Sequence, residues 1–494
     1  MFRGGTALLA ATLSGAACSH VRPVHAIDEG VAPKPGALWA PPPEGKAPAP
    51  TPTPAAVVPE KYLTGEAKPT LGDVVDFALR NNPATRSAWF QARSAAADLG
   101  SRRSEYLPTL SLDANLTRQK TSAVGGQFTF LRTTYGASAS LAWLLFDFGG
   151  RAADVEEGER ALFAANWTHN AAIQTLVLQV EQAYYAYLGA RALAASAEVS
   201  VKQAQESLAA AEERHRAGVA TIADELQART ALSQGQLALE TARGQIQTYR
   251  GALATAVGVS PEFAVDLGEL PEISNLEEAR ESVDALIDRA QTERPDLAAA
   301  RFEALKAQSH VRSVRAEGLP AISAVGSLAR IYYYNAGTIP SNNYSGAVLF
   351  HFPVFTGFKN RYDVLKARED AAAAQADADT LSNQVIFQVW TSYYAVQTAT
   401  QQVKTARDLL ASAQQSEDVA LARYKAGVGS ILDLLTAQTA LANARAQDVQ
   451  ARAGWFLSVA QLAHDTGALG PPAAAVAPSP TTPPSAGGGT GETR

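Results

Sequence analysis

Hydrophobic positions along this chain change period in a fixed order, from helix to strand and back to helix. Apolar residues recur every three or four positions from Leu71 to Ser104, which predicts one amphipathic helix that ends before Pro108. Apolar and polar residues then alternate in 110–117 and in 135–145, which predicts two strands of about ten residues each. The segment from Arg151 to Arg216 contains no proline and has a helical pattern, so we expect a helix about 100 Å long.

The same order occurs again in the second half of the chain. Pro83 recurs as Pro295, 212 positions later, and Gly218 recurs as Gly427, 209 positions later. A period above 200 residues is too long for a solenoid repeat, so the sequence indicates a duplicated half-molecule. The repeated elements are the alternating runs 322–328 and 344–354, the long helix from Asn360 to Lys425, and the shorter helices after the glycine turns, 221–257 and 430–463.

Helix lengths predict how each half is arranged. All helices rise by the same distance per residue, so their lengths can be compared through their residue numbers. The helix before the strands and the helix after the glycine turn together are about as long as the long helix. We therefore expect the two shorter helices to stack end to end along the long one. Their faces carry mostly Ala, Gln and small residues. Small side chains bury little area, so an isolated half needs neighbours.

The four predicted strands allow two interpretations. Each strand has one apolar face, and four aromatic residues lie near the ends of the runs, as in the aromatic girdles of membrane strands: Tyr135, Trp143, Tyr344 and Phe352. A hairpin half-buried on the helical core of a soluble protein would show the same alternation. If the strands are in lipid, four of them cannot close and leave two edges unpaired, which predicts self-association. Two chains would give an interior filled by side chains, whereas three chains supply twelve strands and room for a pore.

Composition and charge exclude several classes of function. The chain has 494 residues, 47% hydrophobic and 18% charged, with a net charge of −6, so we expect no nucleic-acid partner. No uninterrupted apolar run reaches about 18 residues, so a spanning helix is not expected. The seven histidines are isolated, and no phosphate-binding loop is present. We therefore expect no enzyme activity, no cofactor and no metal site.

The amino terminus has the layout of a secretory signal, with Arg3, a short apolar run and then small residues before Cys18. Cys18 is the sole cysteine, and its position resembles a bacterial lipobox, which predicts a signal peptide over 1–17 and fatty acylation of Cys18. An ordinary signal peptide with an incidental cysteine is the alternative. The Pro-rich segment 18–69 is expected to be a tether, and 469–494 is expected to be a disordered tail.

Taken in order, these elements resemble the TolC-like outer membrane efflux channels, also called the outer membrane factor family, in its lipoprotein branch. The resemblance covers about 62–467 and includes the early Asn-Pro or Arg-Pro, the Leu-Pro before each first strand, and the two Arg-x-x-Ala-Gly-Val turns. It implies a homotrimer with a twelve-stranded β-barrel in the outer membrane, continuous with a long α-helical periplasmic barrel. It also implies a passive exit duct for efflux or type I secretion, served by a periplasmic adaptor protein and an inner-membrane pump.

The glycine turns have a local explanation and a functional one. Capping chemistry alone explains them: Gly218 and Gly427 suit a left-handed helix end, and Thr221 or Ser430 can cap the next helix. The resemblance implies in addition that the turns are the tip that docks the adaptor. The docking residues would be Ala217, Gly218, Val219, Ala426, Gly427 and Val428.

The resemblance also implies a gate near these turns. Asp224 and Tyr424 match an inter-helix pair that holds such channels shut, and Asp433 matches an acidic ring at the entrance that favours cations. The family pattern is not complete, because Gly429 stands where the best-known member has a gating arginine and Thr436 replaces a second acidic residue.

We expect a domain organisation of two repeats, 70–258 and 283–468, joined by an equatorial segment, 259–282. Two other classes of protein account for part of the sequence. A structural periplasmic coiled-coil protein without channel activity would explain the long helices but not the four matched strands. A soluble periplasmic binding module would explain the secretion signal but should have a compact core with larger apolar residues.

Overall fold

The computed structural model describes residues 68–123, 125, 127–261, 267–273, 281–334 and 340–469. The expected signal peptide, Cys18, and all but the last residues of the expected tether lie outside the described residues, as does the tail from residue 470.

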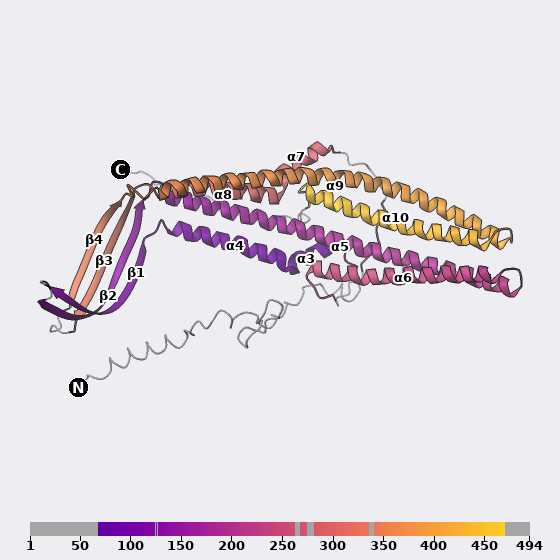
Figure 1. Ribbon diagram of the computed structural model, residues 1–494, viewed down its shortest axis with the longest axis horizontal. Helices are drawn as coiled ribbons and strands as arrows, with labels where there is room; N and C mark the ends of the chain where they lie inside the picture. Colours follow the sequence, from indigo (N-terminus) through magenta and orange to yellow (C-terminus); the bar gives the residue numbers. More distant parts are fainter. Residues whose placement is uncertain are drawn as a thin grey trace, which may run out of the picture. The chain divides into compact units, whose positions relative to one another are not determined.

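Both halves contain the same elements in the same order (Figure 1), which confirms the predicted duplication. The first half consists of α3 (Leu71–Asn81), α4 (Pro83–Ser104), β1 (Thr109–Ala123), β2 (Phe128–Phe146), α5 (Gly150–Arg216) and α6 (Ile222–Val257). The second half consists of α7 (Val283–Glu293), α8 (Pro295–Ala316), β3 (Ala321–Tyr333), β4 (Ser341–His351), α9 (Lys359–Lys425) and α10 (Ile431–Asp465).

The prediction of one continuous helix from Leu71 to Ser104 is wrong. The helix breaks at Asn82, which has an extended conformation (φ −68°, ψ 128°), and α4 restarts with Pro83 at its first turn. The ring of a proline disfavours the helical conformation of the preceding residue, and Asn82 then caps the new helix by accepting a hydrogen bond from the backbone N–H of Ala84 at 2.8 Å. Arg294 is likewise extended (φ −68°, ψ 121°) and precedes Pro295 at the start of α8, but its side chain does not cap that helix.

Each long helix carries its shorter partners along its length, as predicted. In the first half α4 and α6 pack along successive stretches of α5, and in the second half α8 and α10 pack along α9 (Figure 1). The ends of the short helices meet closely: the Asn82 side-chain amide donates to the carbonyl of Ala256 near the end of α6 at 2.9 Å. A Cβ on Gly258 would lie 3.0 Å from the Cα of Asn82, so glycine is needed at this joint, where φ is +81°.

The four strands form one antiparallel sheet in the order β1-β2-β3-β4. Its register confirms the predicted shared apolar face, because Leu112, Ala139, Leu328 and Tyr344 lie side by side across the strands. The neighbouring row is polar and consists of Ser111, Ser140, Ser327 and Ser345. Among the described residues no helix covers this apolar face, and Leu112 is 81% exposed and Tyr344 85% exposed. The interpretation as a hairpin half-buried on a helical core is therefore wrong.

Three details of the predicted strands need correction. The strands have 15, 19, 13 and 11 residues, so three are clearly longer than the predicted ten. Tyr135 consequently lies within β2, stacked on Tyr332 of β3 with ring centroids 5.1 Å apart, rather than near a strand end. Phe352 lies beyond β4, which ends at His351, because Pro353 has no N–H to continue the ladder.

A buried arginine that no sequence motif marks joins the sheet to the helices. Arg151, in the first turn of α5, is buried and donates to the carbonyl of Leu144 at 2.6 Å and to that of Glu105 at 3.2 Å. Its guanidinium also lies over the ring of Tyr106, 4.7 Å from the centroid. These contacts fix the end of β2 and the end of α4 to the start of α5.

Within the described ranges, no helix combines the length and the apolarity needed to cross a membrane. The largest buried apolar cluster lies where α3, α5, α6 and α10 meet and includes Val180, Leu188 and Leu267. Many other buried positions of the long helices are alanine, as the composition predicts.

Candidate functional site at the helical turns

The two glycine turns have the same backbone structure. After α5, the N–H of Val219 donates to the carbonyl of Arg214 at 3.0 Å and the N–H of Gly218 to that of His215 at 2.9 Å, with Gly218 at φ +73°. After α9, Val428 donates to Arg423 at 3.0 Å, and Gly427 has φ +77°. Both turns are Schellman motifs, in which glycine avoids the strain of a left-handed residue.

The helices after the turns begin with capping boxes, which confirms the capping interpretation. The hydroxyl of Thr221 accepts from the N–H of Asp224 at 3.3 Å, and the Asp224 carboxylate accepts from the N–H of Thr221 at 2.8 Å. Ser430 and Asp433 make the same reciprocal pair at the start of α10. Thus Asp224 and Asp433, two of the three predicted gate residues, hold the helix ends in place through their carboxylates.

The predicted docking residues are presented to solvent. Val219 is 66% exposed and Val428 is 72% exposed, and the preceding alanines and glycines are also exposed. Ile222 and Leu432, in the first turns of the following helices, are exposed as well. Each turn therefore ends in a small apolar surface on a rigid backbone.

Behind the turns, the two helical hairpins pack against each other through an apolar cluster. The cluster combines Ala211 of α5 and Ala228 of α6 with residues of α9 and α10, namely Tyr424, Ile431, Leu434 and Leu435. Tyr424, the third predicted gate residue, is only 6% exposed. A groove of about 750 Å³ opens beside this cluster, between α5 and the pair α9–α10. The polar residues that line it include Glu206, Glu213, Asp418 and Lys425.

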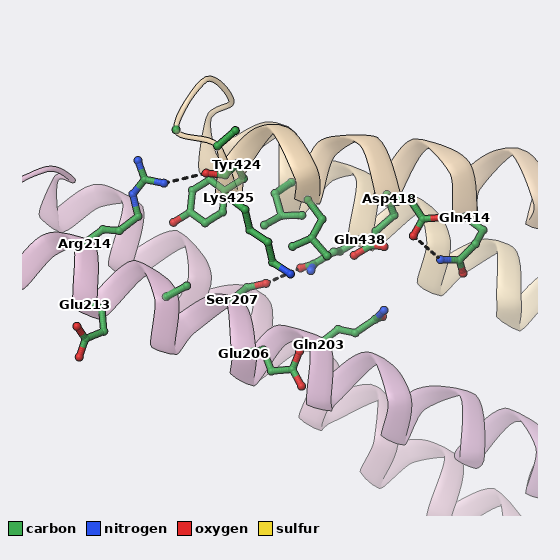
Figure 2. A pocket seen from close by; sticks show the side chains of 16 residues that line it. Gln203, Glu206, Ser207, Glu213, Arg214, Gln414, Asp418, Tyr424, Lys425 and Gln438 are labelled. Carbon is green, nitrogen blue, oxygen red and sulfur yellow. Dashed lines mark hydrogen bonds between the residues drawn. The ribbon is translucent and has the colours of Figure 1, made fainter.

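The residue that contacts Tyr424 across the hairpins is Arg214 (Figure 2). Its Nη1 donates to the main-chain carbonyl of Tyr424 at 2.9 Å, and its guanidinium lies over the tyrosine ring, 4.7 Å from the centroid. Burial raises the pKa of the Tyr424 hydroxyl, the charge of Arg214 opposes this, and the carboxylate of Asp224 adds to the rise. Asp224 is thus close enough to act on Tyr424 electrostatically, while its carboxylate accepts hydrogen bonds from the N–H and the hydroxyl of Thr221.

The two positions that depart from the family pattern have local explanations. A Cβ on Gly429 would lie 3.0 Å from the Cβ of Arg423, so a larger residue there requires a small shift of the turn. The hydroxyl of Thr436 donates to the carbonyl of Leu432 at 2.7 Å and therefore serves the helix backbone.

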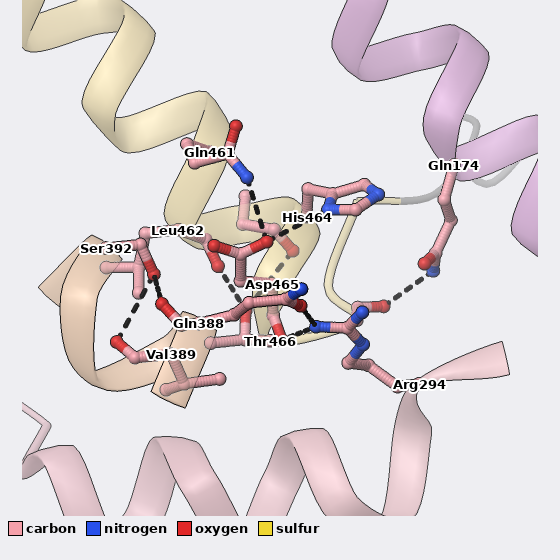
Figure 3. Close-up of polar contacts among 12 residues, drawn as sticks. Gln174, Arg294, Gln388, Val389, Ser392, Gln461, Leu462, His464, Asp465 and Thr466 are labelled. Carbon is pink, nitrogen blue, oxygen red and sulfur yellow. Dashed lines mark hydrogen bonds and ion pairs between the residues drawn. The ribbon is translucent and has the colours of Figure 1, made fainter. Parts of the chain in front are cut away.

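A second polar cluster lies at the joint between α7, α8 and the end of α10 (Figure 3). Arg294 is 5% exposed and donates to Gln388 of α9 at 2.6 Å, to the carbonyl of Asp465 at 3.4 Å and to Asp296. Burial alone would raise the pKa of Asp296, but the hydrogen bonds and charge of Arg294 hold it below its usual value. The repetition of Asn82-Pro83 as Arg294-Pro295 marks this joint in the sequence, whereas the partners of Arg294 are distant along the chain.

Three arginines fix the described part of the segment between the halves. Arg191 of α5 donates to the carbonyl of Leu267 at 2.8 Å, and Arg407 of α9 donates to that of Ile273 at 2.7 Å. Arg452 of α10 pairs with Glu272 at 2.7 Å. The segment 267–273 is thereby tied to helices of both halves.

A chain with two duplicated helical hairpins, a joint four-stranded sheet and an uncovered apolar sheet face has the architecture of an outer-membrane channel subunit. The sequence pattern described as outer membrane efflux protein matches residues 74–259 and 286–468. The chain therefore belongs to the outer membrane efflux protein family. This confirms the predicted resemblance to the efflux channels and the role of exit duct, while membership of the lipoprotein branch stays a prediction.

Individual relatives agree with this assignment. The chain is 28% identical to Protein CyaE of Bordetella pertussis, over 76% of this chain and 79% of the relative. It is also 28% identical to Outer membrane protein OprJ of Pseudomonas aeruginosa, over 74% of this chain and 77% of the relative.

Two solved channels share its fold. The outer-membrane channel OprN matches with a TM-score of 0.74 at 21% identity, over 82% of this chain and 92% of that one. The Campylobacter jejuni CmeC outer membrane channel matches with a TM-score of 0.72 at 19% identity, over 83% and 88%.

Proposed function

We propose that three copies of this chain associate around a common axis and form one water-filled passage across the outer membrane. The observation that carries the proposal is the amphipathic four-stranded sheet, whose apolar face is uncovered and whose outer strands β1 and β4 each have one unpaired edge within the described chain. Unpaired strand edges are costly in lipid, and twelve strands from three chains would close the sheet around a pore.

The same proposal assigns the helical turns to a partner. The exposed surfaces around Val219 and Val428 are rigid, small and apolar, which suits docking of a periplasmic adaptor that links the duct to an inner-membrane pump. Asp224, Tyr424 and Asp433 would form the gate behind them. The duct itself conducts passively and takes its energy from the pump, and an acyl chain on Cys18 would add a second attachment to the membrane.

Conductance measurements test the duct. Protein purified from outer membranes in detergent is expected to run as a heat-sensitive trimer and to give discrete conductance steps in planar lipid bilayers. A freely soluble monomer, or trimers that never conduct, would contradict the proposal. The docking surface is tested separately by placing a photo-crosslinking residue at Val219 or Val428 and identifying the captured protein. Matched positions on the exposed face of α6, such as Leu237, serve as the control.

A further inference from the structure

The two turns are related by duplication, but their side chains are used differently. Arg214 and His215 of the first turn correspond to Arg423 and Tyr424 of the second, 209 positions later. Arg423 is exposed, and the ring of His215 stays within its own turn, 3.2 Å from the carbonyl of Ala220. Arg214 and Tyr424 instead meet each other, one from each half (Figure 2). One residue from each of these two equivalent pairs, Arg214 and Tyr424, thus makes the contact between the hairpins.

This contact lies at the end of a polar seam between α5 and the second hairpin. Further along the seam Ser207 donates to Gln438 at 3.1 Å, and Arg445 donates to Gln203 at 3.0 Å. These contacts line or border the groove of about 750 Å³. The polar part of this seam consists of single hydrogen bonds beside an open groove, and water can replace each of them at low cost, whereas the apolar cluster around Tyr424 supplies the remaining packing. Breaking the contact nearest the turns should therefore have the largest effect on the distance between the hairpins.

We propose that Arg214 is a closure residue, which holds the two hairpins of a chain together at the tip until a partner separates them. The proposal rests on the proposed function as a duct. Arginine suits this role because its planar guanidinium can lie over the tyrosine ring and donate to the main-chain carbonyl at the same time. The Tyr424 carbonyl belongs to the last turn of α9, where a cation is also favoured by the helix dipole.

The test compares Arg214→Gln with Arg216→Gln in planar bilayers. Arg216 lies two residues away, is exposed and pairs only with Glu213 of its own helix among the described contacts. We expect Arg214→Gln to raise the open probability of the channel about tenfold. The Arg216→Gln control should behave like the wild type. Arg214→Lys keeps the charge but not the stacking geometry, so its open probability should lie between the two.

A second readout does not depend on conduction. Cysteines at Ser207 and Gln438, in a chain with Cys18→Ala, report whether the hairpins are in contact through the rate of intrachain disulfide formation. Arg214→Gln should slow this rate several-fold, whereas Arg216→Gln should not. Slower crosslinking in a protein that never conducts would support closure by Arg214 and contradict the duct. Unchanged crosslinking and conductance in Arg214→Gln would overturn the closure role alone.

A double-mutant comparison separates this contact from the hydroxyl pair implied for Tyr424 and Asp224. Tyr424→Leu removes the ring beneath Arg214, so it should open the channel as Arg214→Gln does, and combining both should add little. If Tyr424→Phe opens the channel as far as Tyr424→Leu while Arg214→Gln stays closed, the hydroxyl is the closing group and our proposal is wrong.

Discussion

At the scale of single residues, equivalent positions in the two halves do the same task with different chemistry. Asn82 precedes the proline that starts α4 and donates to a main-chain carbonyl at the end of α6. Arg294 precedes the proline that starts α8 and donates to a main-chain carbonyl at the end of α10. Asn82 does this with a neutral amide, whereas Arg294 brings a charge that must be balanced by Asp296 in a buried place. The second joint is therefore the more sensitive to pH and to substitution.

We expect Arg294→Gln to destabilise the protein by about 2 kcal/mol at neutral pH, because it leaves the Asp296 carboxylate partly buried without its cation. The pKa of Asp296 is lowered in the folded state, so its contribution to stability is fully present above its unfolded value of about 3.9 and is lost as the pH falls through the lower folded value. The difference in melting temperature from the wild type should thus be constant from about pH 8 to pH 5 and shrink below about pH 4.

Thermal unfolding in detergent, followed by circular dichroism, measures this difference. Arg289→Gln is the matched control, since Arg289 lies on the neighbouring α7 and pairs with Glu281 at 2.9 Å on the surface. Water screens an exposed pair of this kind, so its loss should change the stability little. Equal melting temperatures for the two variants at pH 7 would show that Arg294 is not the residue that holds the joint.

At the scale of elements, alternation and helical periodicity predicted most of the fold. The strands, the long helices and the capped turns all follow from local patterns, because one strand face or one helix end is decided by a few neighbouring residues. The pattern does not predict the break at Asn82, because buried positions keep a helical spacing on both sides of it, with Val74 and Ala78 before and Ala88 and Ala92 after. The contact between Arg214 and Tyr424 joins residues 210 positions apart, and no local pattern encodes such a pairing.

The pairing of β2 with β3, which joins the two halves of the sheet, leads to a prediction at the scale of elements. Gly136 of β2 faces β3, and a Cβ there would lie 2.2 Å from the carbonyl oxygen of Arg330. Gly136→Ala should therefore disrupt pairing of β2 with β3 and reduce the amount of folded protein in the outer membrane. The expected destabilisation is about 1 to 3 kcal/mol, as for other overpacked sites.

A second glycine of the same sheet is the control for this substitution. A Cβ on Gly346 of β4 would meet no atom within 4 Å, so Gly346→Ala should assemble normally. Heat-modifiability on gels and the melting temperature in detergent compare the two variants. A Gly136→Ala protein as stable as Gly346→Ala would mean that the strands are farther apart than described.

At the scale of the whole molecule, the sheet of one chain is incomplete. Its polar row, from Ser111 to Ser345, and its apolar row, from Leu112 to Tyr344, both run across all four strands and end at unpaired edges. If three chains close the sheet, β1 of one chain must pair with β4 of the next so that polar residues continue on one face. The face of each position is known from the register within the chain.

This geometry predicts which cysteine pairs form a covalent trimer. Asp113 of β1 shares a face with Ser341, Asn343 and Ser345 of β4, whereas Asn342 and Tyr344 lie on the opposite face. In a chain with Cys18→Ala, Asp113→Cys combined in turn with cysteine at each β4 position should give disulfide-linked trimers on non-reducing gels. At least one of the three same-face positions should crosslink efficiently, and neither opposite-face position should. Crosslinking at the opposite-face positions would reverse the assigned face, and no crosslinking at any position would mean that Asp113 does not lie opposite residues 341–345 of the next chain.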